Sequence, residues 1–509
     1  MTPPEPAESQ NNGQDALPGS KDAVATLDTL QTDSDIFPPR TSLAAGLLAT
    51  LNGSEFAVSH ADIALLLRAL PEQGRGVTLN ILLIDRLLRE LDRRLSAQMD
   101  AILHAPAFQR LESTWRGLAL LVDNIPFHEN IQLTLLHATQ EELLADFEFS
   151  PDITSSGYYQ HVYSAGYGQF GGVPVAAVIG CYDFTPGAAD IKLLHYLSVV
   201  SAMAHAPFLS AAGATFFGVD SLADLPAILD LDAVMAAPTH IRWQALRATP
   251  DARYLGLTVC RFLQREPYTP ASQQVRQFVY QEQIGTHQHL LWGNSAFLLA
   301  LCLAGSFARY RWCPNIIGAE SGGAFRNLPA RYYAALGRWQ EKIPTETLLS
   351  DQWQYRLSMA GFIPLGVRKQ GQDVVFYSAN SIQSPQYTDL TPEGMNARVN
   401  DQLGAQLPYL FIITRLAHTI KVLQRERLGS WRNRGDLQHQ LNNWLKRFVS
   451  DQENPPASVR SRRPLRAARI EVQEVANDPG WYLTQLHVQP HFKHMGSNFV
   501  LALTGRLDK

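Results

Sequence analysis

The chain has 509 residues, which corresponds to about three domains of ordinary size or to one large multi-lobed body. Its apolar share of 46% is typical of a globular protein, and 43 Lys and Arg residues against 47 Asp and Glu residues give a formal charge of -4, which does not indicate a polyanionic partner for the whole chain. The four cysteines are far apart and show no Cys-x-x-Cys spacing, so a secreted disulfide framework and a zinc ribbon are both unexpected.

The N-terminal forty residues are predicted to be a disordered tail. The first twenty have neither a basic start nor an apolar stretch, so they do not resemble a secretory signal. One short amphipathic stretch, residues 23–30, places Val24, Leu27 and Leu30 at helical spacing. A solvated tail is the favoured interpretation, and a linear motif that docks as a helix in a partner's groove is the alternative.

A long amphipathic helix is predicted over residues 78–103. Apolar residues recur every three or four positions, at Ile81, Ile84, Leu88, Leu91, Leu95, Met99 and Ile102. A helix of this length needs a long groove, supplied either by its own fold or by another chain, and the sequence leaves both options open.

The middle of the chain is predicted to be α/β. A strand is expected at 131–136, followed by a Thr139/Glu142 capping box that opens a helix over 141–147. An apolar strand at 175–180, a helix at 188–205 and a second apolar segment at 208–213 then predict a right-handed crossover with a buried parallel sheet. The longest apolar run, 296–304, is too short to cross a bilayer, so a soluble cytoplasmic chain without membrane insertion is expected.

The C-terminal part is predicted to change from helices to strands. Helices are expected at 290–312, 405–428 and 437–448, followed by a basic linker that contains Arg460, Arg462, Arg463, Arg466 and Arg469. Strands are expected near 470–475, 482–488 and 499–503, with a strong turn at 477–480 between the first two.

A serine hydrolase is the principal enzymatic alternative. Residues 319–323 (Ala-Glu-Ser-Gly-Gly) approximate a nucleophile elbow around Ser321, and Asp351 and His418 are available downstream. Because residues 325–329 make a poor helix opening, the pattern is weak. No phosphate-binding loop occurs, and the glycines of 168–172 are better explained by a turn.

Metal and nucleic-acid sites are not expected. His487, His491 and His494 cluster without a nearby carboxylate, and surface histidines explain them better than a zinc site does. The arginines lack interleaved aromatic residues, so contact with an acidic protein surface or plain solvation is favoured over nucleic acid. No cofactor is expected.

Several phrases of the sequence resemble one family in order. Residues 108–118 (Phe-Gln-Arg-Leu-Glu-Ser-Thr-Trp-Arg-Gly-Leu) resemble the phrase that opens the core of the TssC (VipB, EvpB) family, the large subunit of the type VI secretion contractile sheath. Further matches follow at residues 167–172, 204–208, 253–257, 320–324, 344–346, 407–411, 415–418, 463–465, 479–480 and 490–492. The resemblance covers about residues 80–500. It also reinterprets the phrase around Ser321 as a structural turn.

The resemblance implies a structural protein and not an enzyme. The implied fold is a mixed α/β, multi-lobed body related to contractile phage tail sheaths, with C-terminal strands for inter-subunit sheets. The resemblance divides the chain into a tail (1–40), a helical segment that packs on the small subunit (41–105), a central body (106–400) and a C-terminal part with helices, basic linker and strands (401–509). Residues 493–496 depart from the family's usual acidic and apolar stretch there.

The resemblance also implies partners. The chain would form a heterodimer with the small sheath subunit (TssB, VipA), polymerise with other copies around the inner tube protein Hcp, meet a baseplate, contract to propel the tube, and be recycled by the AAA+ unfoldase ClpV. Nucleic acid is not among the implied partners.

Each implied contact can be assigned to residues. The small-subunit interface is expected at Ile84, Leu88, Leu91 and Leu95, and the inter-subunit strands at Ile470, Val472, Leu486, Val488, Phe499 and Leu501. Inner-tube contact is expected at Arg460, Arg462, Arg463 and Arg466, and unfoldase docking at Val24, Leu27 and Leu30. A hydrolase that uses Ser321 and a cytosolic peptide-binding adaptor remain the alternatives.

Overall fold

The structure is a computed structural model that describes residues 81–169, 171–270, 278, 280–326, 328–329, 331–335, 338–368, 373–384, 401, 403–425, 434–450, 452, 455–474, 482–491 and 501–507. Two compact units are distinguished, Met1–Arg94 and Leu95–Lys509, and their border falls inside helix α4 (Ile81–Leu103). The predicted docking helix with Val24, Leu27 and Leu30, the turn at 477–480 and the side chain of Phe499 lie outside the described residues.

A six-stranded sheet forms the centre of the unit Leu95–Lys509, with the strand order β1-β2-β3-β9-β10-β6. The first four strands are parallel, and β10 and β6 are added antiparallel. Their bounds are β1 Val178–Phe184, β2 Phe208–Ala212, β3 Leu255–Val259, β9 Phe362–Val367, β10 Val374–Phe376 and β6 Ala324–Phe325. The central strands β2 and β3 are buried along their whole length, as expected for a parallel sheet covered on both faces.

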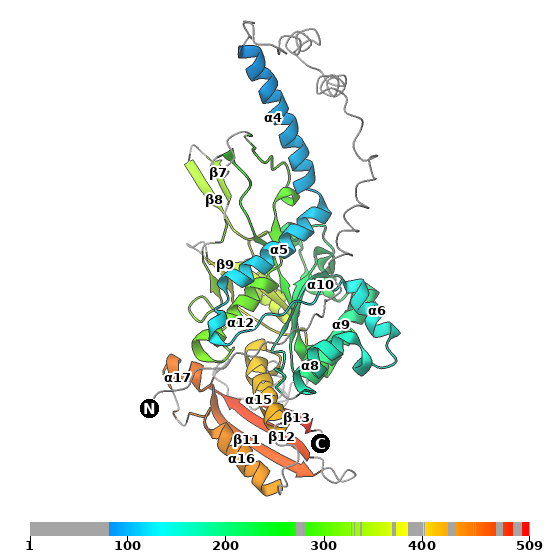
Figure 1. Cartoon of the computed structure of the whole chain (residues 1–509), viewed down its shortest axis with the longest axis vertical. Helices are drawn as coiled ribbons and strands as arrows, with labels where there is room; N and C mark the ends of the chain where they lie inside the picture. The colour runs from blue at the N-terminus through cyan, green and yellow to red at the C-terminus, as the bar shows by residue number, and fades with distance from the viewer. Residues whose placement is uncertain are drawn as a thin grey trace, which may run out of the picture. The chain divides into compact units, whose positions relative to one another are not determined.

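Helices cover this sheet, and in Figure 1 α12 (Ala296–Tyr310) and α9 (Ala188–Ala204) lie on either side of the strands. Helix α12 also packs against α5 (Pro106–Asn124), and α6 (Gln140–Phe149) packs against α9. The other helices are α7 Gly157–Tyr159, α8 Ala165–Tyr167, α10 Leu231–Met235, α11 Ile241–Arg247 and α13 Asp351–Met359. Two small ladders complete this part: β4 Phe262–Leu263 with β5 Trp292–Gly293, and β7 Arg331–Ala335 with β8 Arg338–Lys342.

A second core lies in the C-terminal part. It is enclosed by α15 (Leu407–Arg425), α16 (Arg434–Lys446) and an antiparallel sheet of β11 (Leu465–Glu474), β12 (Tyr482–Pro490) and β13 (Leu501–Leu507). Leu486 lies opposite Ile470 in the ladder, and both side chains are buried. Alternate residues of β11 and β12 are therefore buried in this second core.

Several sequence predictions are confirmed. The capping box exists, because the Glu142 amide donates to Thr139 Oγ1 (3.1 Å) and the Thr139 amide to Glu142 Oε2 (2.7 Å). The predicted crossover is present as β1–α9–β2, with β1 and β2 parallel. The long helix is present over the described Ile81–Leu103. The mixed α/β fold class is thus correct.

Other predictions differ from the structure. The strand predicted at 131–136 is wrong for this chain alone, because no described strand pairs with that segment. The predicted helix at 290–312 begins only at Ala296, since Trp292–Gly293 form β5. The basic segment is not an irregular linker: Arg460 and Arg462 lie on helix α17 (Ala457–Arg462), and Arg466 and Arg469 lie on β11.

Candidate functional site

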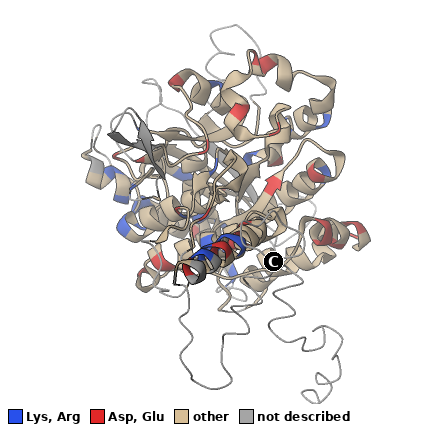
Figure 2. Cartoon of the chain, turned by 90° about the horizontal axis from the view of Figure 1, so that it is seen from above, with Lys and Arg blue, Asp and Glu red and all other residues tan. Residues whose placement is uncertain are grey.

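Helix α4 carries the predicted stripe of apolar side chains. Leu88, Leu91 and Leu95 are 52%, 46% and 43% exposed, although leucines favour burial. Ile84 continues the stripe by its position in the helix, and its side chain lies outside the described residues. Three of the charged residues of α4 bind one another, with Glu90 accepting from Arg93 (2.7 Å) and Arg94 (3.1 Å), and both blue and red residues lie on this helix in Figure 2. Such charge pairing leaves the apolar stripe as the distinctive surface of α4.

Helix α5 carries a second apolar stripe that the sequence reading missed. Its buried face packs through Gly117 and Leu121 on Phe297, whereas Leu111 and Trp115 on another face are 56% and 61% exposed. The signal was present in the sequence, because Phe108, Leu111, Trp115, Leu118 and Val122 are spaced alternately by three and four residues, the spacing of helices that pack on other helices.

Exposed apolar side chains concentrate in one stretch of the chain. Eleven of the twenty large hydrophobic side chains that are exposed in the described part of the unit Leu95–Lys509 lie between residues 95 and 136. They are Leu95, Met99, Ile102, Phe108, Leu111, Trp115, Val122, Phe127, Leu133, Leu135 and Leu136. Exposed apolar groups that form one contiguous patch mark an interaction surface, whereas single ones scattered over a protein do not. We call this set the apolar stretch.

A buried ionic network holds the apolar stretch to the body of the protein. Arg265 binds Glu282 through two hydrogen bonds (2.6 and 3.2 Å) and Glu112 of α5 through a third (2.9 Å). His104 also contacts Glu282 at 3.1 Å, and Tyr280 donates to Asp100 of α4 at 2.6 Å. Burial alone would raise the pKa of Glu282, but the hydrogen bonds from Arg265 hold it below its ordinary value. The carboxylate therefore stays ionised, and the C-terminal end of α4 and α5 are fixed in place.

Several of the phrases that resemble a known family lie where separate segments of the chain contact one another. Tyr167 donates to the Ala204 carbonyl (3.0 Å), which also accepts from Nε2 of His418 (3.1 Å), and Nδ1 of His205 contacts the Tyr254 hydroxyl (3.2 Å). Four phrases that are far apart in sequence therefore meet at the C-terminal end of α9. The residues of these phrases therefore connect segments of the fold that are distant in sequence.

Ser321 does not lie in a nucleophile elbow. Neither a strand before it nor a helix after it is present among the surrounding described residues, and the next element is the two-residue β6. Gly322 has φ of 102°, and the Gly323 amide donates to the Gly318 carbonyl (3.0 Å), so the segment is a closed turn. Burial lowers the pKa of His418 to about 4, which makes this histidine a weak base at neutral pH.

The C-terminal sheet has one protected edge. The side chain of Asn442 on α16 accepts from the Ile470 amide (3.0 Å) and donates to the Ile470 carbonyl (2.8 Å), and Gln438 accepts from the Val472 amide (3.1 Å). The outer edge of β11 is thus occupied by amide side chains that imitate a strand. At the opposite edge, β13 pairs only with β12 within the described residues.

The predicted strand residues belong to the chain's own core. The side chains of Ile470, Val472, Leu486 and Val488 are at most 2% exposed and pack in the second core. Their side chains therefore contribute to the second core of this chain. Leu501 begins β13, at the open edge.

The predicted inner-tube arginines are solvent-accessible. Arg460, Arg462 and Arg463 are exposed and Arg466 is half-buried, and none of them forms an ion pair with another described residue. Ser461, which lies between them, is buried and accepts from the Asn315 side chain (2.9 Å), which anchors α17 to the body.

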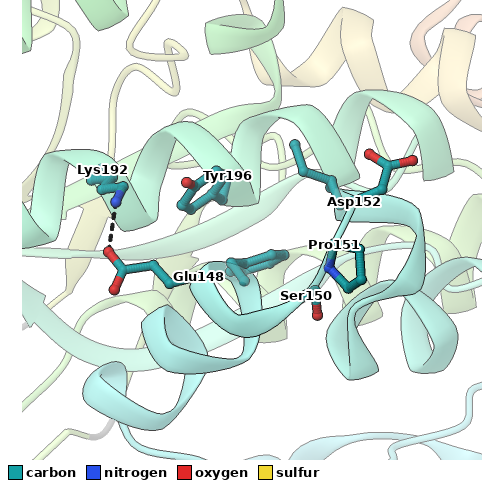
Figure 3. Close-up of a pocket in the computed structure, with 8 residues that line it drawn as sticks. Glu148, Ser150, Pro151, Asp152, Lys192 and Tyr196 are labelled. Carbon is teal, nitrogen blue, oxygen red and sulfur yellow. Dashed lines mark hydrogen bonds and ion pairs between the residues drawn. The ribbon is translucent and has the colours of Figure 1, made fainter.

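One open hollow of about 420 Å³ lies beside α6 and α9 (Figure 3). Its polar side chains already have partners: Lys192 binds Glu148 (2.6 Å), and Ser150 donates to the Asp146 carbonyl (2.6 Å). The hydrogen bond with Glu148 raises the pKa of Lys192. The hollow therefore presents no acid–base pair suited to catalysis.

No three His, Cys, Asp or Glu side chains among the described residues are grouped so that they could hold a metal ion. His487 lies half-buried on β12, His491 is buried with its amide donating to the Pro464 carbonyl (2.9 Å), and His494 lies outside the described residues. None of the described helices combines the length and the apolarity needed to cross a bilayer.

Comparisons with known proteins agree on one family. Residues 85–383 match the family model described as EvpB/VC_A0108, tail sheath N-terminal domain, and residues 396–507 match the EvpB/VC_A0108, tail sheath gpW/gp25-like domain. The chain is 35% identical over 431 residues to the type VI secretion system sheath protein TssC1 of Pseudomonas aeruginosa, a match that covers 83% of this chain and 86% of that protein. Among solved structures, the sheath tail protein Lin1278 from Listeria innocua aligns at 8% identity with a TM-score of 0.33, over 74% of this chain and 62% of that one.

Proposed function

Because the chain belongs to the EvpB/VipB tail sheath family and is a structural subunit of the type VI secretion contractile sheath, we propose that it forms a heterodimer with the small sheath subunit (TssB/VipA). These heterodimers polymerise with other copies around the inner tube protein Hcp, in the cytoplasm and on a baseplate, and the lattice contracts to propel the tube. The chain does this work without catalysis, through two packings of the same subunits.

The apolar stripe of α4 is the proposed docking face for the small subunit. Ile84, Leu88, Leu91 and Leu95 recur at helical spacing on α4, and Leu111 and Trp115 belong to a second exposed stripe on α5. The spacing by three and four residues fits helices of the partner that pack along both. The single observation that carries the proposal is the apolar stretch, which holds more than half of the exposed large hydrophobic side chains of its unit.

The open edge of β13 is the proposed link between neighbouring heterodimers. A free strand edge is a template for another chain's strand, and the opposite edge of this sheet is occupied by Asn442 and Gln438. The link uses backbone groups at and before Leu501, with Phe499 in the adjoining segment.

Two further contacts are proposed from charge and pattern. Arg460, Arg462, Arg463 and Arg466, which form no ion pair with another described residue, face the inner tube, and reversal of the charges of Arg462 and Arg463 should reduce the amount of Hcp that remains in isolated sheaths. Val24, Leu27 and Leu30 form the segment that the unfoldase ClpV recognises, and their replacement by serine should slow the disassembly of contracted sheath.

The interface is tested by co-expression with a tagged small subunit. The double variant Leu88→Asp, Leu91→Asp is expected to lower the amount of this chain that co-purifies by at least tenfold, because two carboxylates would be buried without partners. Leu229→Asp is the matched control, since Leu229 is 96% exposed outside the apolar stretch. A double variant that folds and co-purifies as well as the control would show that α4 is not the interface.

A further inference from the structure

Residues 131–137 (Ile-Gln-Leu-Thr-Leu-Leu-His) form an extended segment with which no strand in the described part of the chain pairs. The sequence has the composition of a strand, and its residues have neither helical nor turn structure. No backbone amide of this segment donates a hydrogen bond to another described residue. An apolar segment whose backbone groups are unpaired is unusual, because strands normally satisfy these groups with a neighbour.

Both ends of this segment are fixed to the body. Ile131 packs against the cluster that contains Leu121 and Ile125 at the end of α5. At the other end, the Ala138 carbonyl accepts from the Tyr182 hydroxyl at 2.6 Å, and Thr139 caps α6. The contact with β1 is made by a side chain and not by the backbone, so the segment is not an added strand of the central sheet.

The side chains of the segment are exposed. Leu133, Leu135 and Leu136 are 36%, 65% and 49% exposed, and the segment contains no Lys, Arg, Asp or Glu. Edge strands that must stay single are commonly protected by charges, prolines or bulges, and this segment has no charge and no proline. Its chemistry is that of a strand prepared for an uncharged partner strand.

We propose that residues 131–137 pair with an extended segment of the small sheath subunit, which adds to them as a β-strand. This inference rests on the proposed heterodimer. The small subunit is the chosen occupant because the segment directly continues the apolar stretch of α5. Its leucines would otherwise stay uncovered in the smallest assembly unit, before any lattice forms. A second copy of this chain could cover them only within the lattice.

The test is a proline scan with matched alanines at residues 132, 133, 134 and 135. Proline removes an amide hydrogen and favours extended backbone, and these amides make no hydrogen bond within the described chain, so the chain itself should tolerate the substitutions. In a β-ladder, alternate amides point toward the partner. One pair of positions, either 132 and 134 or 133 and 135, should therefore be sensitive to proline. At the sensitive pair, each proline should lower co-purification with the tagged small subunit at least fivefold below the matched alanine. At the other pair, proline and alanine should give equal co-purification.

The outcomes separate the two proposals. An alternating pattern supports strand pairing, and misfolding of the chain would not produce one. Prolines that behave like their alanines at all four positions overturn it. Prolines that leave the heterodimer intact but prevent tubule formation in electron micrographs also overturn it. Such a result would mean that a second copy of this chain, and not the small subunit, pairs with the segment. If the unsubstituted chain fails to co-purify with the small subunit, the proposed heterodimer itself is wrong.

Discussion

Individual residues in this protein mainly join segments that are distant in sequence. Gly117 shows this directly, since a β-carbon at its position would lie 2.3 Å from the buried ring of Phe297. The glycine lets α5 approach α12 closely enough for Leu121 to pack, which sets the position of the stripe that carries Trp115. Gly117, which belongs to the family phrase at residues 108–118, thus serves the packing of two helices.

Glu346 connects two other segments, and its pKa predicts how the stability of the protein depends on pH. It binds Arg261 through two hydrogen bonds of 2.7 Å, and its side chain is fully buried. Burial alone would raise the pKa of Glu346, but the two hydrogen bonds from Arg261, together with the nearby imidazole of His287, lower it to about 2. Because the folded pKa lies below the ordinary value of about 4.5, the stabilisation is complete above pH 4.5 and is lost as pH falls toward 2.

The expected contribution of Glu346 is on the order of 3 kcal/mol at neutral pH. Glu346→Gln should therefore lower the melting temperature at pH 7, and between pH 5 and pH 3 its melting temperature should fall less than that of the unsubstituted protein. Thermal melting at several pH values measures both. Parallel curves for the two proteins would contradict the assignment.

At the scale of elements, strand edges determine where another chain can add. In the sheet β11–β12–β13, β13 has no second neighbouring strand among the described residues, while β11 is covered by the amide side chains of α16. Amide side chains at this position satisfy backbone groups and at the same time prevent a second strand from pairing there.

The double variant Asn442→Ala, Gln438→Ala should expose the edge of β11. Loss of the three hydrogen bonds leaves the Ile470 and Val472 amides unpaired, at a cost of about 1–3 kcal/mol for each such group that stays buried. We expect a lower melting temperature together with more irregular aggregates in light scattering. Asn443→Ala is the matched control, because Asn443 lies on the exposed side of α16 and contacts His439. Equal aggregation of the two variants would show that Asn442 and Gln438 do not guard this edge.

Periodicity predicted some elements well and missed others for physical reasons. The helix α4 and the capping box of α6 follow from local patterns and are present as predicted. The strands β3 and β9 were not predicted, because they are buried on both faces and therefore show no alternation. The segment 131–136 was predicted as a strand from its composition, but a strand also needs a neighbour, which sequence composition does not report.

The candidate site was predicted in part. The stripe of α4 followed from spacing, whereas the stripe of α5 was overlooked because residues 108–118 were interpreted only as a family phrase. Ile470, Val472, Leu486 and Val488 were correctly placed on strands. Alternation does not distinguish a face that packs on the chain's own helices from one that meets a neighbour, so their role in inter-subunit contact could not be inferred from it.

On the scale of the whole molecule, the chain combines a packed body with surfaces for which we propose partners. The parallel sheet and buried ionic pairs such as Arg265–Glu282 belong to the body, while the apolar stretch and the edge of β13 are not covered by other described residues. A contractile lattice requires this combination, because its subunits must keep their shape while their packing changes.

The most direct test of the central claim is electron microscopy of the tagged chain purified from its native cells. We expect hollow, cross-striated tubules that contain a second, smaller subunit. We also expect that a chain truncated before Phe499 yields heterodimers without tubules, because the adjoining strand β13 is lost. A monodisperse particle without a partner from the full-length chain would contradict the account.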